Sequence, residues 1–223
     1  MIPWEQLGTA KIPGADGELR LLRRGSEYSI MTGGITLMNS RMSGSEKALA
    51  DLTCAPLADR AAPVVLIGGL GMGFTLRAAL AILPADATVV VAELVPAVAA
   101  WARGPMSDIF AGCLDDPRTR LEVTDVGALI QAGDKNFDAI LLDVDNGPGA
   151  LDRPENNSLY SMAGLAEARR ALKSGGVLAV WSAMPDTEFS KRLSNAGFTV
   201  DEHRVHAHRK GKGSRHVIWL ARA

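Results

Sequence analysis

Cysteine is scarce in this sequence, and no charge sign and no long hydrophobic run dominates it. Only Cys54 and Cys113 occur, without CxxC or metal-ligand spacing, so nothing requires a disulfide and a reducing compartment fits. The 24 basic and 25 acidic residues leave a net charge of -1, which gives no sign of a nucleic-acid or membrane-surface partner. These absences favour a small-molecule substrate.

The sequence also shows no pattern typical of a signal peptide or of a membrane-spanning helix. The N-terminal stretch MIPWEQLGTAKIPGADGELR carries charges and prolines where a signal peptide would need an apolar core. No apolar run approaches the roughly 18 residues that a membrane-spanning helix needs. We therefore expect a soluble, cytoplasmic protein without a membrane partner.

The length of the chain and its local sequence patterns predict one main domain with a small additional N-terminal unit. The 223 residues are 47% apolar, enough for one substantial α/β core. Short β-rich runs separated by glycine, ELRLLRRG, EYSIMTGG and ITLMNS, are typical of a small antiparallel unit. A helix fits Ser45 to Cys54. We expect a small N-terminal β-unit with its linking helix over residues 1–56 and a Rossmann-like domain over residues 57–223.

From Val64 onward, apolar strands alternate with amphipathic helices. The predicted strands cover residues 64–68, 88–93, 120–125, 138–144 and 176–182, and the predicted helices cover residues 74–83, 95–104, 126–133 and 159–176. This order predicts a parallel sheet covered by helices on both faces. The chain ends in FTVDEHRVHAH, the basic turn RKGKGSR and HVIWLARA, which together predict a β-hairpin.

A glycine-rich turn, GGLGMG, follows the first of these strands. Gly69, Gly71 and Gly73 can supply positive φ and let the backbone approach a ligand closely. A purely structural turn has the same composition, so the motif needs support from its neighbours. Its spacing is GxGxG, whereas a dinucleotide-binding loop has GxGxxG.

Two acids at the following strand ends supply that support. Glu93 ends VVVAE, where a carboxylate can accept hydrogen bonds from both ribose hydroxyls; the alternative is a solvated strand-end acid. Asp125 follows the third strand, where it can accept from an adenine amino group or cap the next helix, and the two roles are compatible. The combined pattern resembles the S-adenosylmethionine-dependent transferases more than the NAD enzymes.

The ordered motifs narrow this resemblance to one family. VLIGGLGMG, VAELVP, DDPRTRLEVTD, FDAILLDVDNGPG and ALKSGGVLAVWS occur in the order and spacing of the spermidine synthase-like family of polyamine aminopropyltransferases. The resemblance implies a Rossmann-like, methyltransferase-type sheet with an antiparallel last strand, preceded by a small N-terminal β-unit. It also implies an oligomer, and we expect a homodimer.

The same resemblance implies an activity and a set of site residues. The family transfers an aminopropyl group from decarboxylated S-adenosylmethionine to an amine, without a metal. Carried over to this sequence, the donor-binding residues are Gly68, Gly69, Gly71, Gly73, Glu93 and Asp125; the catalytic acids are Asp143 and Asp145; and Glu46 and Tyr160 bind the acceptor. For Tyr160, a place in the core is an equal alternative.

The chemistry supports Asp143 independently of the family. An amine attacks the carbon beside a sulfonium only through a free lone pair, so a carboxylate that orients it and takes its proton is useful. A carboxylate also attracts a cationic polyamine. The alternative interpretation of DVDNGPG is a polar turn that simply ends a strand.

The departures from the family pattern keep two further functions open. The family's glycine loop carries an aspartate that binds the aminopropyl nitrogen, and here the loop has Leu70, Gly71 and Met72. The family's Tyr and His before the helix glutamate are replaced by Ser43 and Gly44. A methyltransferase that uses intact S-adenosylmethionine and a non-catalytic nucleoside-binding protein are therefore the alternatives.

Four histidines gather near the C-terminus. His203, His206, His208 and His216 invite a metal site, since three imidazoles can bind zinc. No cysteine or carboxylate stands at a recognised ligand spacing, so we expect exposed strand histidines and no metal. One of them would approach the substrate if the hairpin borders the pocket.

Overall fold

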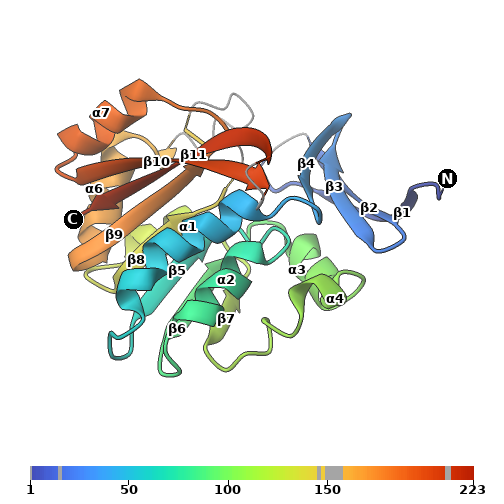
Figure 1. The fold of residues 1–223 in the computed structure, drawn as a ribbon, viewed down its shortest axis with the longest axis horizontal. Coiled ribbons are helices and arrows are strands. Elements are labelled where there is room, and N and C mark those ends of the chain that lie inside the picture. Colours follow the sequence, from blue (N-terminus) through green and yellow to red (C-terminus); the bar gives the residue numbers. More distant parts are fainter. Residues whose placement is uncertain (1, 15–16, 145–146, 149–157, 209–211) are drawn as a thin grey trace.

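The computed structural model describes residues 2–14, 17–144, 147–148, 158–208 and 212–223, and it contains two sheets (Figure 1). The first is an antiparallel four-stranded sheet of β1 (Glu5–Lys11), β2 (Glu18–Arg24), β3 (Glu27–Thr32) and β4 (Ile35–Asn39), paired in chain order. The predicted N-terminal β-unit is confirmed.

The second sheet has seven strands in the order β10-β11-β9-β8-β5-β6-β7. These are β5 (Val64–Gly68), β6 (Thr88–Ala92), β7 (Thr119–Glu122), β8 (Phe137–Leu142), β9 (Leu172–Ser182), β10 (Thr199–His208) and β11 (Lys212–Arg222). Strands β5 to β9 are parallel, whereas β11 is antiparallel to both β9 and β10. The predicted Rossmann-like sheet with an antiparallel last strand is confirmed.

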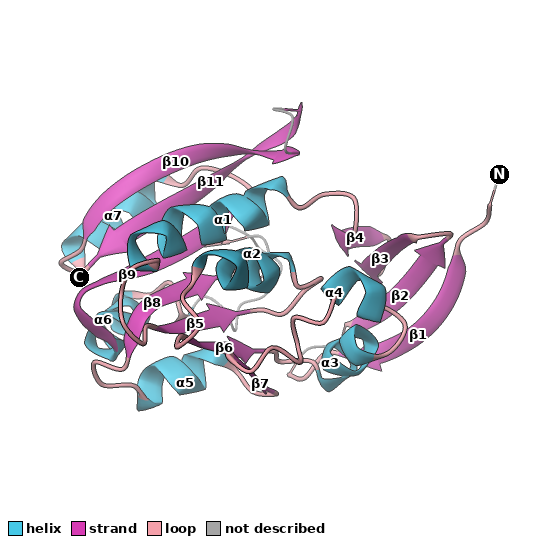
Figure 2. Cartoon of the chain, turned by 60° about the horizontal axis from the view of Figure 1, so that its bottom comes forward, coloured by secondary structure: helices cyan, strands magenta, loops and turns pink. Residues whose placement is uncertain are grey.

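Helices cover both faces of the large sheet (Figure 2). Successive strand residues alternate between two cores: Val65 and Ile67 pack in the core that holds Leu49 and Leu76, while Leu66 packs in the core that holds Ile130, Leu165 and Phe189. The helices of the described residues are α1 (Gly44–Cys54), α2 (Phe74–Ile82), α3 (Pro96–Arg103), α4 (Ser107–Phe110), α5 (Val126–Ala132), α6 (Met162–Ala171) and α7 (Thr187–Asn195), with a 3₁₀ turn η1 (Ala55–Leu57).

Two features of the second half differ from the sequence prediction. The helix predicted over residues 159–176 is too long, because α6 ends at Ala171 and β9 begins at Leu172. This polar stretch pairs with β8 through the main chain, with an irregular register between Phe137 and Ala139, and Lys173 also reaches the buried Asp138 of β8 at 2.7 Å. No periodicity in the sequence reveals this ion pair. Helix α7 was not predicted, although Asp186 caps it by accepting from the amides of Glu188 and Phe189.

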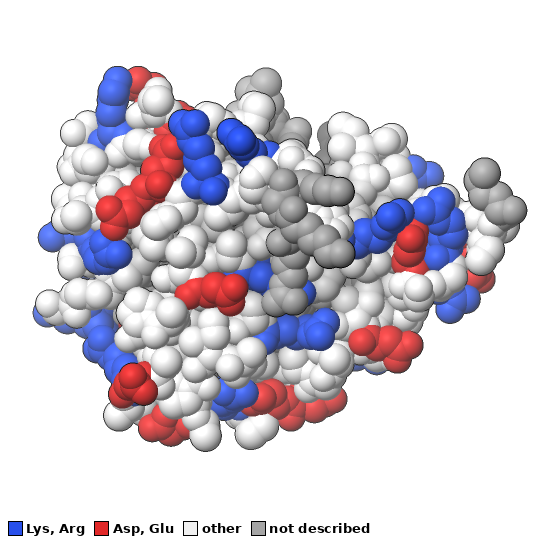
Figure 3. All heavy atoms as spheres, viewed as in Figure 1, with Lys and Arg blue, Asp and Glu red and all other residues white. Residues whose placement is uncertain are grey.

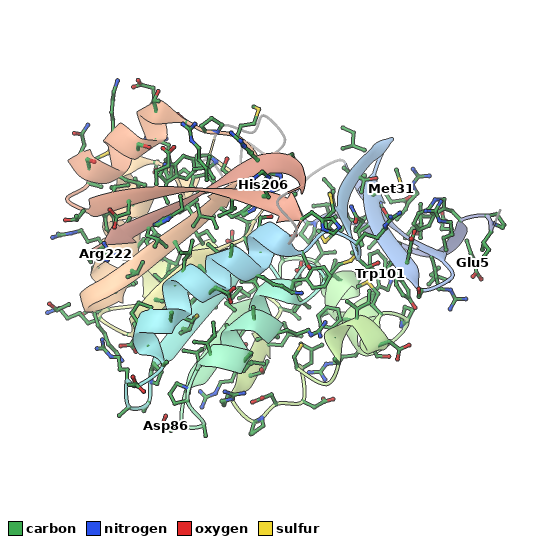
Figure 4. The ribbon with its side chains drawn as sticks, viewed as in Figure 1. Glu5, Met31, Asp86, Trp101, His206 and Arg222 are labelled. Atoms are coloured by element: carbon green, nitrogen blue, oxygen red, sulfur yellow. The ribbon has the colours of Figure 1, made fainter. Side chains whose placement is uncertain are left out.

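Trp101 of α3 lies toward the small sheet (Figure 4). A Cβ on Gly8 of β1 would lie only 2.8 Å from the indole Nε1 of Trp101. A glycine is therefore required where the strand passes over this ring. This contact joins the small sheet to the helices of the large domain, while the domain boundary at residue 56 remains a prediction.

Acidic and basic side chains are interspersed on the face shown in Figure 3, which agrees with the balanced composition of 24 basic and 25 acidic residues. Among the described residues, no helix is long and apolar enough to cross a membrane.

Candidate functional site

The glycine loop between β5 and α2 has the backbone that its composition predicts. Gly69, Gly71 and Gly73 have φ values of 92°, 51° and 73°, a region that other residues rarely adopt. The amide of Gly73 donates to the carbonyl of Leu70 at 2.9 Å and closes the turn. A Cβ on Gly73 would lie 2.6 Å from the ring of Phe110, so packing as well as φ requires glycine there.

The same loop contacts the end of β8 through the main chain. The amide of Asp143 donates to the carbonyl of Gly68 at 3.0 Å. A Cβ on Gly69 would lie 2.4 Å from the carbonyl oxygen of Asp143. The predicted donor loop and the predicted catalytic acid are therefore in direct backbone contact.

Glu93, at the end of β6, supports the loop from its other side. Its side chain is buried, and Oε2 accepts from the amide of Leu70 at 3.1 Å while Oε1 accepts from the amide of Val95 at 2.8 Å. Hydrogen bonds from backbone amides to a carboxylate are of the stronger, charge-assisted kind. Glu93 thus holds the glycine loop in place, and its predicted bond to a ribose remains a prediction.

Asp125 caps α5. Its Oδ1 accepts from the amide of Gly127 at 2.7 Å, and the residue is exposed. The helix-cap interpretation is confirmed, and the predicted contact with an adenine amino group remains a prediction.

An acid pair lies beside the glycine loop. Asp143 accepts a hydrogen bond at Oδ2 from Thr75 of α2, with 2.6 Å between the oxygens. Glu46, in the first turn of α1, accepts at Oε2 from the hydroxyl of its neighbour Ser45 at 2.8 Å. The negative charge of Glu46 acts on Asp143, so the structure brings together two acids that are far apart in sequence.

Burial controls the ionisation of this pair. Loss of solvent, helped by the charge of Glu46 and opposed by the Thr75 hydrogen bond, raises the pKa of Asp143 to about 7. Burial also raises the pKa of Glu46, against the lowering effect of the Ser45 hydrogen bond. Near neutral pH the pair therefore favours a shared proton or a bound cation over two negative charges.

His216 of β11 reaches this pair through Ser45. Its Nδ1 lies 2.9 Å from Ser45 Oγ, and its Nε2 lies 2.9 Å from Ser214 Oγ. The ring of Trp181 packs edge-on against the imidazole, with centroids 4.8 Å apart. Burial lowers the pKa of His216.

The expectation of exposed strand histidines is wrong for three of the four. Only His208 is exposed, whereas His203, His206 and His216 are half-buried. His203 and His216 lie on the face of the sheet that α1 covers. Among the described residues, no group of three or more His, Cys, Asp or Glu is placed to hold a metal ion.

The remaining residues singled out in the sequence are either buried in the apolar core or lie outside the described residues. Asp145 lies outside the described residues. Tyr160 is buried in the core, edge-on to Phe189 with centroids 5.6 Å apart, so the core alternative describes its position and its contact with a substrate is untested. Leu70 and Met72, which occupy the glycine loop in place of an acid, are both buried in the apolar core.

Sequence reasoning missed Thr75 and the role of Ser45. Thr75 stands 68 positions from Asp143, and Ser45 stands 171 positions from His216. Ser45 was interpreted only as part of a helix start. The histidine-rich hairpin was the one signal that pointed toward this network.

A cavity of about 400 Å³ lies apart from this site, between the small sheet and the end of β10. Its lining includes Arg24, Arg41, Glu27 and His208. Glu27 already pairs with Arg24 at 2.7 Å and with Arg41 at 3.4 Å. With two guanidinium groups and one carboxylate, this cavity does not favour a polycation, unlike the acid pair.

The chain has a Rossmann-like fold that solved S-adenosylmethionine-dependent transferases share. The structure of a spermidine synthase from Thermotoga maritima matches 97% of this chain and 72% of its own, with a TM-score of 0.73 and 18% identity. A 1,6-didemethyltoxoflavin-N1-methyltransferase from Burkholderia thailandensis matches 81% of this chain and 78% of its own, with a TM-score of 0.56 and 22% identity. The fold is thus common to both kinds of transferase.

Within that class, the chain is spermidine synthase-like in sequence as well as in fold. A polyamine aminopropyltransferase of Mycobacterium tuberculosis is 30% identical over 198 residues, which covers 85% of this chain. The chain spans 36% of the length of that relative. No protein-family model matches the chain. The resemblance predicted from the motifs is confirmed.

Substitution of Gly69 by alanine tests the backbone contact. Gly112 also has a positive φ, 78°, but a Cβ there would have nothing within 4 Å of it, so Gly112→Ala should cost only the strain of that backbone, about 1–2 kcal/mol. Gly69→Ala adds a clash with Asp143 and should cost about 1–3 kcal/mol more. Urea denaturation of both variants measures the difference, and equal losses would show that the clash is absent.

Asp143→Asn should change how stability depends on pH. Because folding raises the pKa of Asp143 to about 7, its contribution is fully present below the unfolded pKa near 4 and is lost as pH rises toward 7. The variant should therefore gain stability relative to wild type between pH 4 and 7.5, on the order of 1–3 kcal/mol. Denaturant titrations at both pH values measure this gain.

The exposed acid Asp108 of α4 supplies the control. Asp108→Asn removes one surface carboxylate, so it corrects for the change in net charge. A stability difference between Asp143→Asn and wild type that stays constant with pH would contradict the raised pKa.

Proposed function

We propose that the chain binds an adenosyl sulfonium donor and transfers an alkyl group from it to an amine. The preferred version is aminopropyl transfer from decarboxylated S-adenosylmethionine to a polyamine-type acceptor. The observation that carries the proposal is the acid pair of Asp143 and Glu46 beside the glycine loop, with an aspartate whose pKa is raised to about 7. Similarity to the polyamine aminopropyltransferases supports it.

In this proposal, the glycine loop and two strand-end acids bind the donor. The positive-φ glycines let backbone approach the adenosyl group. A carboxylate offers about four acceptor positions, so ribose hydroxyls would add to the two amide bonds that Glu93 already accepts. Asp125 would accept from the adenine amino group while it caps α5.

The acid pair would handle the acceptor. An acceptor amine, cationic in solution like a lysine, would be drawn to Asp143 and Glu46 and would give a proton to Asp143. Its lone pair then forms the new N–C bond as the S–C bond breaks, and the sulfonium leaves as a neutral thioether. Holding the amine and the donor carbon in line for attack can lower the activation barrier by roughly 7–11 kcal/mol. A general base increases the rate by about 10²- to 10⁴-fold.

We assign two further residues to the acceptor side on the family resemblance. Asp145 would share the role of Asp143 or bind a second amine, and Tyr160 would line the acceptor pocket. Gly147, four positions after Asp143, lies against the carboxyl end of β9, because a Cβ there would lie 2.4 Å from Ser182 Oγ.

Methyl transfer from intact S-adenosylmethionine is the second candidate. It is favoured by one observation, the apolar interior of the glycine loop, where Leu70 and Met72 are 4% and 3% exposed. Neither side chain offers a carboxylate to a cationic aminopropyl nitrogen. The common fold with a methyltransferase permits this reaction as well.

We further propose a cytoplasmic homodimer that works without a metal or a nucleophilic thiol. Burial raises the pKa of Cys54 to about 12 and that of Cys113 to about 11, so neither is a thiolate at neutral pH. The family resemblance and the sparse cysteines support the assembly and the compartment.

Asp143→Asn should abolish turnover while leaving donor binding nearly intact. We expect a rate loss of about 10²- to 10⁴-fold, because the variant cannot accept a proton, and a donor Kd within about threefold of wild type. Mass spectrometry of products from a panel of amines measures turnover and shows whether methyl or aminopropyl is added. Asp108→Asn is again the matched control.

Calorimetry with S-adenosylmethionine, its decarboxylated form and methylthioadenosine ranks the donors. If none of the three binds, the donor proposal fails; if a donor binds and no amine is alkylated, the chain is a nucleoside-binding protein. A normal rate in Asp143→Asn would remove the catalytic role of this acid, and equal loss of rate and donor binding would move it to the donor site.

A further inference from the structure

A continuous row of hydrogen bonds leads from the acid pair to the surface. Glu46 Oε2 lies 2.8 Å from Ser45 Oγ, which lies 2.9 Å from His216 Nδ1. His216 Nε2 lies 2.9 Å from the hydroxyl of Ser214. Ser45 is 1% exposed, whereas Ser214 is exposed, so the row crosses from the interior to solvent.

The packing of α1 against the hairpin holds this row together. A Cβ on Gly44 would lie 2.8 Å from the carbonyl oxygens of both His206 and Ala207. The start of α1 therefore touches the main chain of β10, which places Ser45 within reach of the next strand. Trp181 holds the imidazole from a third element, β9. The ring orientation is thus set by three separate contacts.

We propose that His216 acts through Ser45 as a positioning residue, and that Glu46, Ser45, His216 and Ser214 form a proton exit from the acid pair to solvent. The role in turnover rests on the proposed function, in which the amine gives its proton to Asp143. The Asp143 carboxyl then passes this proton to the Glu46 carboxylate, whose charge acts on it, and Glu46 starts the exit. The coupling between Glu46 and His216 does not rest on the proposed function.

The exit consists of two balanced steps. With Glu46 protonated, its carboxyl donates to Ser45 Oγ, Ser45 donates to the unprotonated Nδ1 of His216, and Nε2–H donates to Ser214. A shift of two protons by one bond each leaves a Glu46 carboxylate and a His216 imidazolium. The imidazolium then loses its Nε2 proton to water beside Ser214, so one proton has left the site; the imidazole is now the Nδ1–H tautomer, which donates to Ser45 Oγ while Ser45 donates to the Glu46 carboxylate.

The groups that face His216 bear on its titration. Helix α1 contributes Glu46 and Ser45, β9 contributes the neutral ring of Trp181, and β11 contributes Ser214. On β10, Val205 pairs with His216 directly, and His203 lies diagonally on the same face. Asp143 acts from β8 through the charge of Glu46. Of these charges, Glu46 alone is linked to the imidazole by a hydrogen-bonded path.

The first experiment measures the His216 pKa by NMR in the full chain. Glu46→Gln removes a negative partner and should lower that pKa by about 0.5–1 unit. In a Ser45→Ala background the same change should have a smaller effect, because the path is cut. His203→Gln is the control, and an unchanged His216 pKa in Glu46→Gln would overturn the coupling.

The second experiment measures turnover and its rescue. His216→Ala should lower kcat about tenfold with little change in donor KM, and added imidazole should restore part of the rate, which a merely structural residue would not allow. His203→Ala should keep the wild-type rate and show no rescue. Thermal melts check that both variants fold.

The outcomes separate this inference from the proposed function. If wild type transfers no group but Glu46→Gln still shifts the His216 pKa, the proposed function fails and the proton-coupled row remains. If wild type is active and His216→Ala matches it, or loses activity without rescue by imidazole, the proton exit fails and the proposed function remains.

Discussion

The main-chain contact between Gly69 and Asp143 is the constraint on which the site depends. The ends of two neighbouring parallel strands, β5 and β8, meet there: the amide of Asp143 donates to the carbonyl of Gly68 at 3.0 Å, and a Cβ on Gly69 would clash with the Asp143 carbonyl. The turn that would approach a donor and the acid that would approach an acceptor in the proposed function are therefore joined through the main chain. Glu93 also holds the loop, from β6. In the proposed function, this main-chain contact would fix the distance between the donor and the acceptor amine without any movement of the backbone.

The acid pair of Asp143 and Glu46 places two negative charges close together at this site. Two carboxyl groups in a poorly solvated place repel each other, and Thr75 and Ser45 offset only part of this cost with one hydrogen bond each. A proton bound between the two carboxyl groups would remove this repulsion, and so would an ammonium group of a bound ligand. In the proposed function, selectivity for a cation would arise from the same desolvation that raises the pKa of Asp143, and a neutral or anionic ligand would leave that cost in place.

The sequence predicted what depends on local pattern. β5 matches its predicted bounds, because VVLIG is apolar and ends at glycine, and the positive φ of Gly69 follows from its residue type. The end of α6 was wrong, since the start of β9 is polar and is tied to the sheet by Lys173 and Asp138. The contact of Ser45 with His216 could not be predicted, because it depends on how a helix and a hairpin 171 positions apart pack together.

The contact of Gly44 with the hairpin has a consequence for how such chains diverge. Because a side chain at this position would meet the main chain of His206 and Ala207, the first helix and the last hairpin cannot change independently. A related sequence with a bulky residue at the start of this helix must carry its hairpin along a different path. A chimaera that takes the first helix from one such protein and the last hairpin from another would then contain a clash between the two elements. The two ends of the chain therefore have to change together in evolution.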